Sequence, residues 1–199
     1  MENKHLTRCP WCLKDPAYIK YHDEEWGVPV HDDKKHFEFI VLETSQAGLS
    51  WLTVLKKRSE YFRSFDGFDP VKVAAYDEKK FNLLLTNPGI IRNKQKIRSA
   101  INNASKFLEI QKEFGSFDKY IWRFTEFKPQ INSYDNDKEI PPSTGLSLKI
   151  SMDLKKRGFT FAGSTIVYAH LQATGIVNDH LTSCFRYGEI IQSYATDNS

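Results

Sequence analysis

The sequence predicts an all-α fold built from many helices of moderate length. Apolar residues recur with the helical period of 3.6 along most of the chain, whereas the alternation typical of strands does not recur. Pro and Gly separate these periodic segments, as expected at helix ends. Short apolar runs such as 160–162 are compatible with a strand, but they are isolated. The 199 residues therefore predict one helical domain with a substantial core.

Capping and breaking residues define the predicted helices in order along the chain. Asp15 is a suitable N-cap and precedes Pro16, which favours the first helical position. Asp77 caps a further helix, which ends at Pro88-Gly89. The predicted helices cover residues 16–25, 34–46, 51–65, 78–85, 94–108, 117–125, 144–157 and 164–174.

Two of these helices have a clear apolar face. The helix of residues 51–65 is expected to turn three apolar side chains inward, Leu52, Leu55 and Phe62. The longest helix carries an apolar stripe formed by Ile97, Ile101, Ala104 and Leu108. Residues 127–142 are polar and contain three prolines, which predicts a loop. The polar residues 186–199 predict a flexible tail behind a single domain of residues 1–185, with two lobes around a cleft.

The composition excludes several classes of protein. With 40% hydrophobic residues, 27% charged residues and a net charge of +3, the chain is neither disordered nor collagen-like. No run approaches the roughly 18 apolar residues of a membrane helix. The first residues lack the apolar region of a secretion signal. We therefore expect a cytoplasmic protein with no membrane partner.

The cysteines and two histidines predict a zinc site that joins the two ends of the chain. Three cysteines are too few for a disulfide framework, which leaves metal binding or a reactive thiol. His180 and Cys184 are four residues apart and share a face if this stretch is helical. Cys9 and His22 are expected to supply the second pair of ligands. Four protein ligands leave no open position for water, so the site would be structural.

Other interpretations of these residues stay open at this stage. A His–Cys pair at this spacing also arises by chance, and Cys12 is an alternative ligand to His22. Cys9 and Cys12 further form a CxxC pair, which is typical of thiol redox proteins. That motif usually accompanies a βαβ pattern, and the sequence shows none.

A basic turn between two predicted helices indicates contact with a nucleic acid backbone. The chain has seven Lys or Arg residues and no acidic residue between Lys79 and Leu108. Gly89 and Ile90 form a turn in which backbone can approach a partner closely. Arg92 and Lys94 precede and open the next helix, whose free amides favour an anion. An ordinary solvated basic face is the alternative.

Aromatic residues and one carboxylate predict a pocket for a flat cationic ring. Aromatic faces supply stacking and cation–π attraction, and a carboxylate supplies a charge-assisted hydrogen bond. Glu43 lies in an otherwise apolar helix, where a carboxylate is unfavourable unless it is paired or used. The aromatic candidates come from the first 51 residues: Trp11, Tyr18, Tyr21, Trp26 and Trp51. The alternative is that these rings are core and that Glu43 faces water.

The order of several blocks resembles the bacterial 3-methyladenine DNA glycosylase I family. Among them are Tyr21-His22-Asp23, Gln46-Ala47-Gly48-Leu49-Ser50-Trp51 and Val177-Asn178-Asp179-His180. Further blocks lie at residues 8–11, 15–29, 42–58, 68–74, 89–92 and 155–163, so the likeness covers about residues 8–184. The resemblance implies the helix-hairpin-helix glycosylase fold and excision of 3-methyladenine from alkylated double-stranded DNA, which leaves an abasic site and free 3-methyladenine.

The resemblance also assigns residues. It implies a zinc ion held by Cys9, His22, His180 and Cys184. It implies that Glu43 and Tyr21 hydrogen-bond the excised base as the catalytic pair and that Trp51 stacks on it. Trp11, Tyr18 and Trp26 are expected to line the same pocket.

Departures from the pattern and rival functions complete the predictions. The family lacks the catalytic aspartate that broader relatives place after the hairpin, and the surroundings of Asp118 do not match one. The glycosidic bond of the alkylated base is already weak and needs no lysine nucleophile, so we expect a monofunctional enzyme that makes no covalent lysine adduct. We also expect a monomer. The rival functions are a DNA-binding module without chemistry and a zinc-dependent thiol enzyme built on Cys9 and Cys12.

Overall fold

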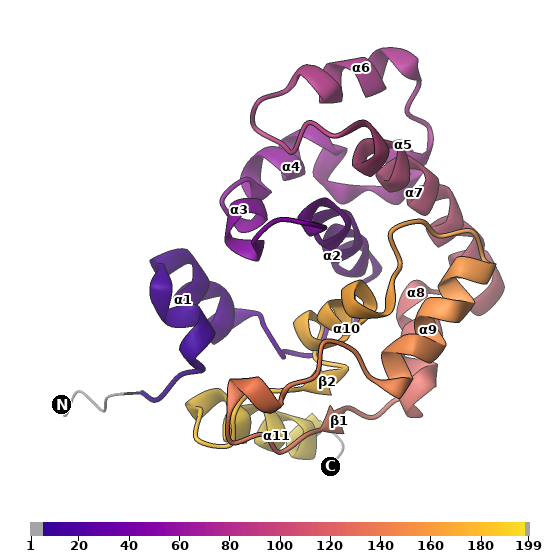
Figure 1. Cartoon of the computed structure of the whole chain (residues 1–199). Coiled ribbons are helices and arrows are strands. Elements are labelled where there is room, and N and C mark those ends of the chain that lie inside the picture. Colours follow the sequence, from indigo (N-terminus) through magenta and orange to yellow (C-terminus); the bar gives the residue numbers. More distant parts are fainter. Residues whose placement is uncertain (1–5, 198–199) are drawn as a thin grey trace.

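The computed structural model describes residues 6–197, with side chains through Tyr194, and confirms a mostly helical fold (Figure 1). The α-helices are α1 (Pro16–Glu24), α2 (Asp33–Gln46), α3 (Trp51–Leu55), α4 (Arg58–Ser64), α5 (Pro70–Ala74), α6 (Glu78–Thr86), α7 (Lys94–Phe114), α8 (Phe117–Trp122), α9 (Gly145–Lys156), α10 (Ser164–Ala173) and α11 (Phe185–Asp197). Short 3-10 helices are η1 (Pro10–Lys14), η2 (Asp66–Phe68), η3 (Arg123–Thr125) and η4 (Asp137–Glu139). No helix of the described residues has the length and apolar character needed to span a membrane.

Side-chain caps begin most of the helices where the sequence predicts them. Asp15 accepts a hydrogen bond from the amide of Ala17, and Asp77 accepts one from Lys80. Asn93 caps α7 in the same way, and Gly115 ends it in the left-handed conformation. These caps are local, so they form from neighbouring residues without help from the tertiary fold.

The core surrounds α2, which lies near the middle of Figure 1 and contacts α3, α7, α8 and α10. Phe37, Val41 and Leu42 of α2 are fully buried. The stripe of α7 is buried at Ile97 and Ala104 as predicted, while Ile101 and Leu108 lie at its half-buried edge. Burial around α2 therefore fixes the helix that carries Glu43.

The single helix predicted for residues 51–65 is wrong, because the structure breaks it into α3 and α4. Lys56 and Lys57 form a turn between them, in which the Lys57 amide donates to the Val54 carbonyl, three residues earlier, at 2.9 Å. The break rotates α4, so that Tyr61 and Phe65 face the core while Phe62 is 52% exposed. The prediction that Phe62 faces inward is therefore wrong as well.

The loop predicted for residues 127–142 contains a short strand. β1 (Gln130–Ile131) pairs in parallel with β2 (Val177–Asn178), and a bridge joins Tyr134 to Leu181. This pairing ties the loop to the segment that leads into His180. Of the tail predicted for 186–199, the residues through Asp197 belong to α11, in which Ile190 is buried, and residues 198–199 lie outside the described residues.

The segment after α1 and the segment after α10 lie against each other. The Gly27 amide donates to Gln172, and the Val30 amide donates to Thr174. A Cβ on Gly175 would lie 2.5 Å from the Pro29 nitrogen, so only glycine fits this approach. The contact brings the N-terminal quarter of the chain to its C-terminal end.

Candidate active site

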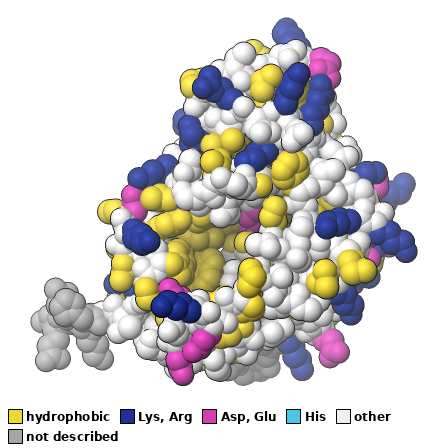
Figure 2. Space-filling model, viewed as in Figure 1, with side chains coloured by type: hydrophobic (Ala, Val, Ile, Leu, Met, Phe, Trp, Pro, Cys, Tyr) yellow, Lys and Arg dark blue, Asp and Glu magenta, His cyan; other side chains and the backbone are white. Residues whose placement is uncertain are grey.

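A cavity of about 400 Å³ lies between α1, α2, α3 and α10. Figure 2 shows a hollow lined by hydrophobic side chains between α1 and α10. All six residues predicted to contact a base line this cavity: Trp11, Tyr18, Tyr21, Trp26, Glu43 and Trp51. Its volume is in the range of small-molecule sites.

Aromatic rings from separate elements form one wall of the cavity. The Trp11 ring lies 5.1 Å from that of Trp26 and 5.5 Å from that of Tyr18, both edge-on. Tyr21 and Trp51 have ring centroids 5.5 Å apart. The Tyr18 hydroxyl accepts a hydrogen bond of 2.9 Å from the Leu52 amide, which ties α1 to the first turn of α3. Trp51 is therefore held beside Tyr21.

Glu43 lies at the inner end of the cavity and is 3% exposed. The interpretation that this carboxyl group faces water is therefore wrong. Its Oε2 lies 2.9 Å from Nδ1 of His170, while its Oε1 is buried and has no hydrogen-bond partner among the described residues. Burial raises the pKa of Glu43 well above its ordinary value.

Two further side chains with polar groups, Trp51 and Tyr21, line the cavity. The Trp51 Nε1 is also buried without a partner in the described chain. Burial, and then the neighbouring charge of Glu43, raise the pKa of the Tyr21 hydroxyl well above its ordinary value. The Tyr21 hydroxyl is therefore a neutral hydrogen-bonding group beside Glu43. Buried unpartnered groups are rare in folded proteins and mark a place for a ligand or water.

Half of the residues that line the cavity were not predicted as site residues from the sequence. These are Gln46, Asp137, Ile140, Ala169, Gln172 and Ala173. The three α10 residues of this set follow a helical spacing that could have indicated a second face. Asp137 and Ile140 lie in the segment expected to be an irregular loop, which carried no pattern to indicate them.

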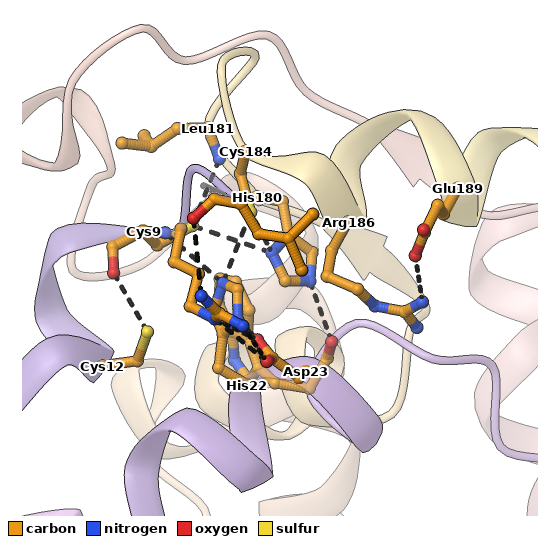
Figure 3. A network of polar contacts seen from close by, with 12 residues as sticks. Cys9, Cys12, His22, Asp23, His180, Leu181, Cys184, Arg186 and Glu189 are labelled. Atoms are coloured by element: carbon orange, nitrogen blue, oxygen red, sulfur yellow. Dashed lines mark hydrogen bonds and ion pairs between the residues drawn. The ribbon is translucent and has the colours of Figure 1, made fainter. Parts of the chain in front are cut away.

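A second cluster lies behind the aromatic wall and joins the two ends of the chain (Figure 3). Cys9, His22, His180 and Cys184 point toward one another, are all buried, and have ligand atoms within 4.8 Å of one another. The structure thus brings together the four residues predicted as metal ligands. Figure 3 also shows Cys12 turned away, with its thiol donating to the Cys9 carbonyl at 3.2 Å.

The distances between these side chains fit a tetrahedral metal ion. Zinc–sulfur bonds of about 2.3 Å and zinc–nitrogen bonds of about 2.0 Å place the two atoms about 3.5 Å apart. The Cys184 sulfur lies 3.4 Å from Nε2 of His22 and 3.6 Å from Nδ1 of His180. The Cys9 sulfur lies 3.7 Å from the same Nδ1. The cluster can therefore hold a metal with little rearrangement.

Outer hydrogen bonds orient both imidazoles of the cluster. The Nδ1 of His22 lies 2.7 Å from Asp23, and the Nε2 of His180 lies 2.9 Å from the Trp26 carbonyl. Such partners fix the tautomer that leaves the other nitrogen free for a metal. One premise of the prediction is wrong, because His180 follows β2 in a loop and Cys184 immediately precedes α11. A turn rather than a helix supplies the spacing.

The predicted basic turn connects α6 to α7 as a hairpin between two helices. The Gly89 and Ile90 amides are bonded to Asn87, and Ile90 is buried. A Cβ on Gly89 would lie 2.2 Å from Glu60, which explains the glycine. Arg92 and Lys94 are exposed.

The amides at the start of α7 remain available for an anion. Those of Arg92, Lys94 and Gln95 have no acceptor among the residues that the structure describes. Figure 2 shows Lys and Arg side chains over the lobe above the hollow. Lys96 differs from its neighbours, since its ammonium is turned inward. A cavity lined by aromatic side chains and one buried carboxyl group, in a helical protein that also has a cationic helical hairpin, fits the class of base-excising DNA repair proteins.

Comparisons with known proteins agree with that class. Residues 11–187 match the family model described as methyladenine glycosylase. The chain is 49% identical to DNA-3-methyladenine glycosylase 1 of Escherichia coli over 92% of its length and 97% of that protein. It is 44% identical to the DNA-3-methyladenine glycosylase of Haemophilus influenzae, over 89% and 96% of the two chains.

Solved structures give the same result. A crystal structure of 3-methyladenine DNA glycosylase I superposes with a TM-score of 0.87 at 49% identity, covering 90% of this chain and 98% of that one. The enzyme from Staphylococcus aureus superposes with a TM-score of 0.87 at 36% identity, over 90% and 96%. The chain belongs to the methyladenine glycosylase family. The predicted family, fold class and glycosylase activity are confirmed.

Proposed function

We propose that this chain recognises 3-methyladenine in alkylated double-stranded DNA with Glu43 and the aromatic wall, and hydrolyses its glycosidic bond. The observation that carries the assignment of residues is the unpartnered Oε1 of Glu43, which lines a cavity together with five aromatic side chains. The relatives are named for the same base, and one solved relative of 36% identity was crystallised in complex with 3-methyladenine. The products are an abasic site and the free base.

Recognition requires the base to leave the duplex. An enzyme acts on a stacked base only after the nucleotide is flipped into a pocket. Trp51 and Tyr21, whose rings lie side by side, are placed to contact the face of the flipped base. The Glu43 Oε1 then accepts a hydrogen bond from the exocyclic amine of the base. This bond gives a partner to an oxygen that is otherwise buried without one, which is unfavourable.

The methyl group on N3 gives the base a positive charge, which makes it a good leaving group. Aromatic faces attract that cation. As the bond to the sugar breaks, the base leaves neutral and water captures the sugar cation. No lysine lines the cavity in the described residues, which supports a monofunctional enzyme that forms no imine with the sugar.

The helical hairpin holds the DNA backbone in this proposal. Arg92 and Lys94 supply positive charge, and the amides at the start of α7 meet a phosphate. Gly89 and Ile90 were predicted to bind the DNA backbone through their own backbone. Their amides are already bonded to Asn87, so they do not donate to a phosphate in this proposal. They shape the turn that presents the other groups. Such contacts position the protein without reading sequence.

The Cys/His cluster is a structural zinc site in this proposal. Cys9, His22, His180 and Cys184 would hold the ion, and four protein ligands leave it no position for substrate. The bound ion would supply cross-linking of the chain ends rather than chemistry. Trp26 packs against both histidines, so the cluster supports the pocket wall. Pocket and cluster each lie within one chain, which supports action as a monomer.

A base-release assay on methylated duplex DNA tests the proposal. The account predicts release of 3-methyladenine well above that of 7-methylguanine, and no adduct after borohydride treatment. A DNA-binding module without chemistry would bind the duplex and release neither base. A thiol enzyme would lose activity in the Cys12→Ser variant. The proposed glycosylase keeps it, because the Cys12 thiol donates to the Cys9 carbonyl and does not line the cavity.

A further inference from the structure

Glu43 is the first member of a buried chain of hydrogen bonds that leads away from the pocket. Its Oε2 lies 2.9 Å from Nδ1 of His170, and Nε2 of His170 lies 3.2 Å from Nδ1 of His36. The Nε2 of His36 lies 3.1 Å from the Val30 carbonyl and 3.7 Å from Asp118. Both histidines are at most 5% exposed, so the chain of hydrogen bonds is shielded from bulk solvent.

The far end fixes the position of one proton. The Val30 carbonyl and the Asp118 carboxylate can only accept hydrogen bonds, so Nε2 of His36 must carry a proton. The remaining groups then have two consistent arrangements. In the first, both imidazoles are neutral: His170 donates to His36, and the protonated Glu43 donates to His170.

The second arrangement contains the same protons in different places. The Oε2–H bond of Glu43 breaks as an Nδ1–H bond forms on His170. The Nε2–H bond of His170 breaks as an Nδ1–H bond forms on His36. Glu43 becomes a carboxylate and His36 becomes an imidazolium, while His170 stays neutral with its other tautomer. Every hydrogen bond survives, and no proton is exchanged with solvent.

We propose that Glu43, His170 and His36 form a proton relay that keeps Glu43 uncharged in the empty pocket and turns it into a carboxylate when a cationic base enters. The proposal deepens the proposed function and rests on it, because it takes Glu43 as the group that meets the base. His170 and His36 are positioning residues, since neither contacts the base directly.

Burial favours the neutral arrangement when the pocket is empty. It raises the pKa of Glu43, lowers the pKa of His170 to about 3 and lowers the pKa of His36. A cation beside Oε1 reverses this preference, because a carboxylate next to a positive charge is stabilised in a medium of low dielectric constant.

Titratable groups surround both ends of the relay, and acidic groups lie at the His36 end. Asp118 of α8 faces His36, and Asp33 of α2 adds a second negative charge near it. His31 contacts Asp118 from the solvent side at 2.9 Å. At the pocket end, Tyr21 of α1 lies beside Glu43, and the titratable side chains of Tyr18 and Asp137 line the same cavity. The imidazolium of His36 therefore forms beside acidic groups and away from the bound cation.

The relay explains selectivity for a charged base over ordinary adenine. A fixed carboxylate would attract any cation but would be costly to bury in the empty enzyme. A fixed neutral acid would not favour the cation at all. The relay gives a response that appears only with the positive charge of the alkylated base.

Two ligands of the same shape isolate the effect of charge. In 3,9-dimethyladeninium a methyl group replaces the sugar and the ring keeps the positive charge. In 3,9-dimethyl-3-deazaadenine carbon replaces N3, so the ring is neutral. Nitrogen NMR of the ¹⁵N-histidine-labelled wild-type protein then reports the protonation of each imidazole.

The relay predicts that Nδ1 of His36 is unprotonated in the free protein and with the neutral ligand, and becomes protonated with the cationic ligand. Nδ1 that stays unprotonated in the cationic complex would overturn the relay. This test needs no variant, so it stands even if a buried histidine cannot be replaced without unfolding the protein.

A variant provides the second test. In His36→Phe the proton has no destination, so the ratio of affinities for the cationic and neutral ligands should fall by about tenfold or more, the equivalent of one pKa unit or more. His31→Gln is the matched control and should keep the ratio within about twofold, because His31 lies outside the chain of hydrogen bonds. An unchanged ratio in His36→Phe contradicts the relay.

Failure of the relay and failure of the proposed function have different signatures. If Glu43→Ala binds both ligands as tightly as the wild type, Glu43 does not meet the base and the proposed function is wrong in that residue. If Glu43→Ala loses affinity while His36→Phe keeps the wild-type ratio, the proposed function stands and the relay is rejected.

Discussion

Lys96 has a role that its neighbours in the basic stretch do not share. It is 8% exposed, and its ammonium donates to the Ser45 carbonyl at 2.8 Å and to the Ala47 carbonyl at 2.6 Å. These carbonyls end α2, two and four residues beyond Glu43. Lys96 therefore provides a hydrogen-bond donor for the free carbonyls at the C-terminus of α2, the helix that carries Glu43. Its positive charge also compensates the negative end of the α2 dipole.

The Lys96→Met variant keeps the apolar stem and removes the ammonium. Each carbonyl left buried without a donor costs about 1–3 kcal/mol. Because the Ala47 carbonyl is only partly buried, we expect the free energy of unfolding to fall by about 2–4 kcal/mol. Urea unfolding followed by tryptophan fluorescence measures this change. Lys94→Met is the matched control, since Lys94 is exposed, and it should change stability by less than about 0.5 kcal/mol.

DNA binding should show the opposite pattern, with an effect of the Lys94 substitution and none of the Lys96 substitution. Lys94→Met should lower the slope of log affinity against log salt by about one, as expected for one lost phosphate contact. Lys96→Met should leave that slope unchanged under conditions where the variant is folded. A Lys96→Met variant as stable as the wild type, or one with a reduced salt slope, would refute the claim that Lys96 stabilises the end of α2 and does not bind DNA.

Three further predictions concern the cluster, the pH dependence and the hairpin. His180→Ala removes one ligand and should abolish stoichiometric zinc in the purified protein and reduce its stability. Metal analysis and urea unfolding measure these two effects. The control Cys12→Ser should keep the zinc. Burial alone would raise the pKa of Glu25, but hydrogen bonds and charge from Arg58 and Lys35 lower it to about 2. The ionised Glu25 therefore stabilises the fold above about pH 4.5. This contribution of up to about 3 kcal/mol is lost as the pH falls toward 2. Gly89→Ala should weaken binding to all duplexes alike, since its Cβ would meet Glu60 and displace the turn.

Distinct outcomes would contradict these three predictions. Full zinc occupancy in His180→Ala would remove that residue from the ligand set. A Glu25→Gln variant whose stability falls as steeply as the wild type between pH 4.5 and 2 would show that another carboxyl group causes the loss. A Gly89→Ala variant with unchanged duplex affinity would show that the shape of the turn does not matter for binding.

Local chemistry made much of the fold predictable. Asp15, Asp77 and Asn93 cap the expected helices because a short polar side chain reaches an amide two or three residues away. The break between α3 and α4 had no such signal. It depends on which face of α4 finds the core, and the exposed Phe62 shows that periodicity alone cannot decide this.

The candidate site was predictable where residue type alone limits the chemistry. Two cysteines and two histidines at the chain ends have few uses in one helical protein, so their meeting was expected even though the assumed helix at His180 is wrong. The aromatic pocket followed from composition and from the family resemblance. Both predictions rest on side chains whose function is tied to their chemical nature.

The residues that were missed are defined by distant neighbours. His170 is 127 residues from Glu43, and each looks like an ordinary helical residue in its own segment. The inward turn of Lys96 cannot be read from a run of basic residues, because it depends on where α2 ends in space. Asp137 lines the pocket only because β1 pairs with β2.

The most direct test of the central claim is single-turnover release of 3-methyladenine from methylated duplex DNA by the wild type, Glu43→Ala and the control Glu24→Ala. Loss of a buried charge-assisted hydrogen bond of about 2–3 kcal/mol should slow release by Glu43→Ala by at least about 30-fold. Glu24 is an exposed residue of α1, so its variant should match the wild type. Release by Glu43→Ala at the wild-type rate would contradict the claim that this acid recognises the alkylated base.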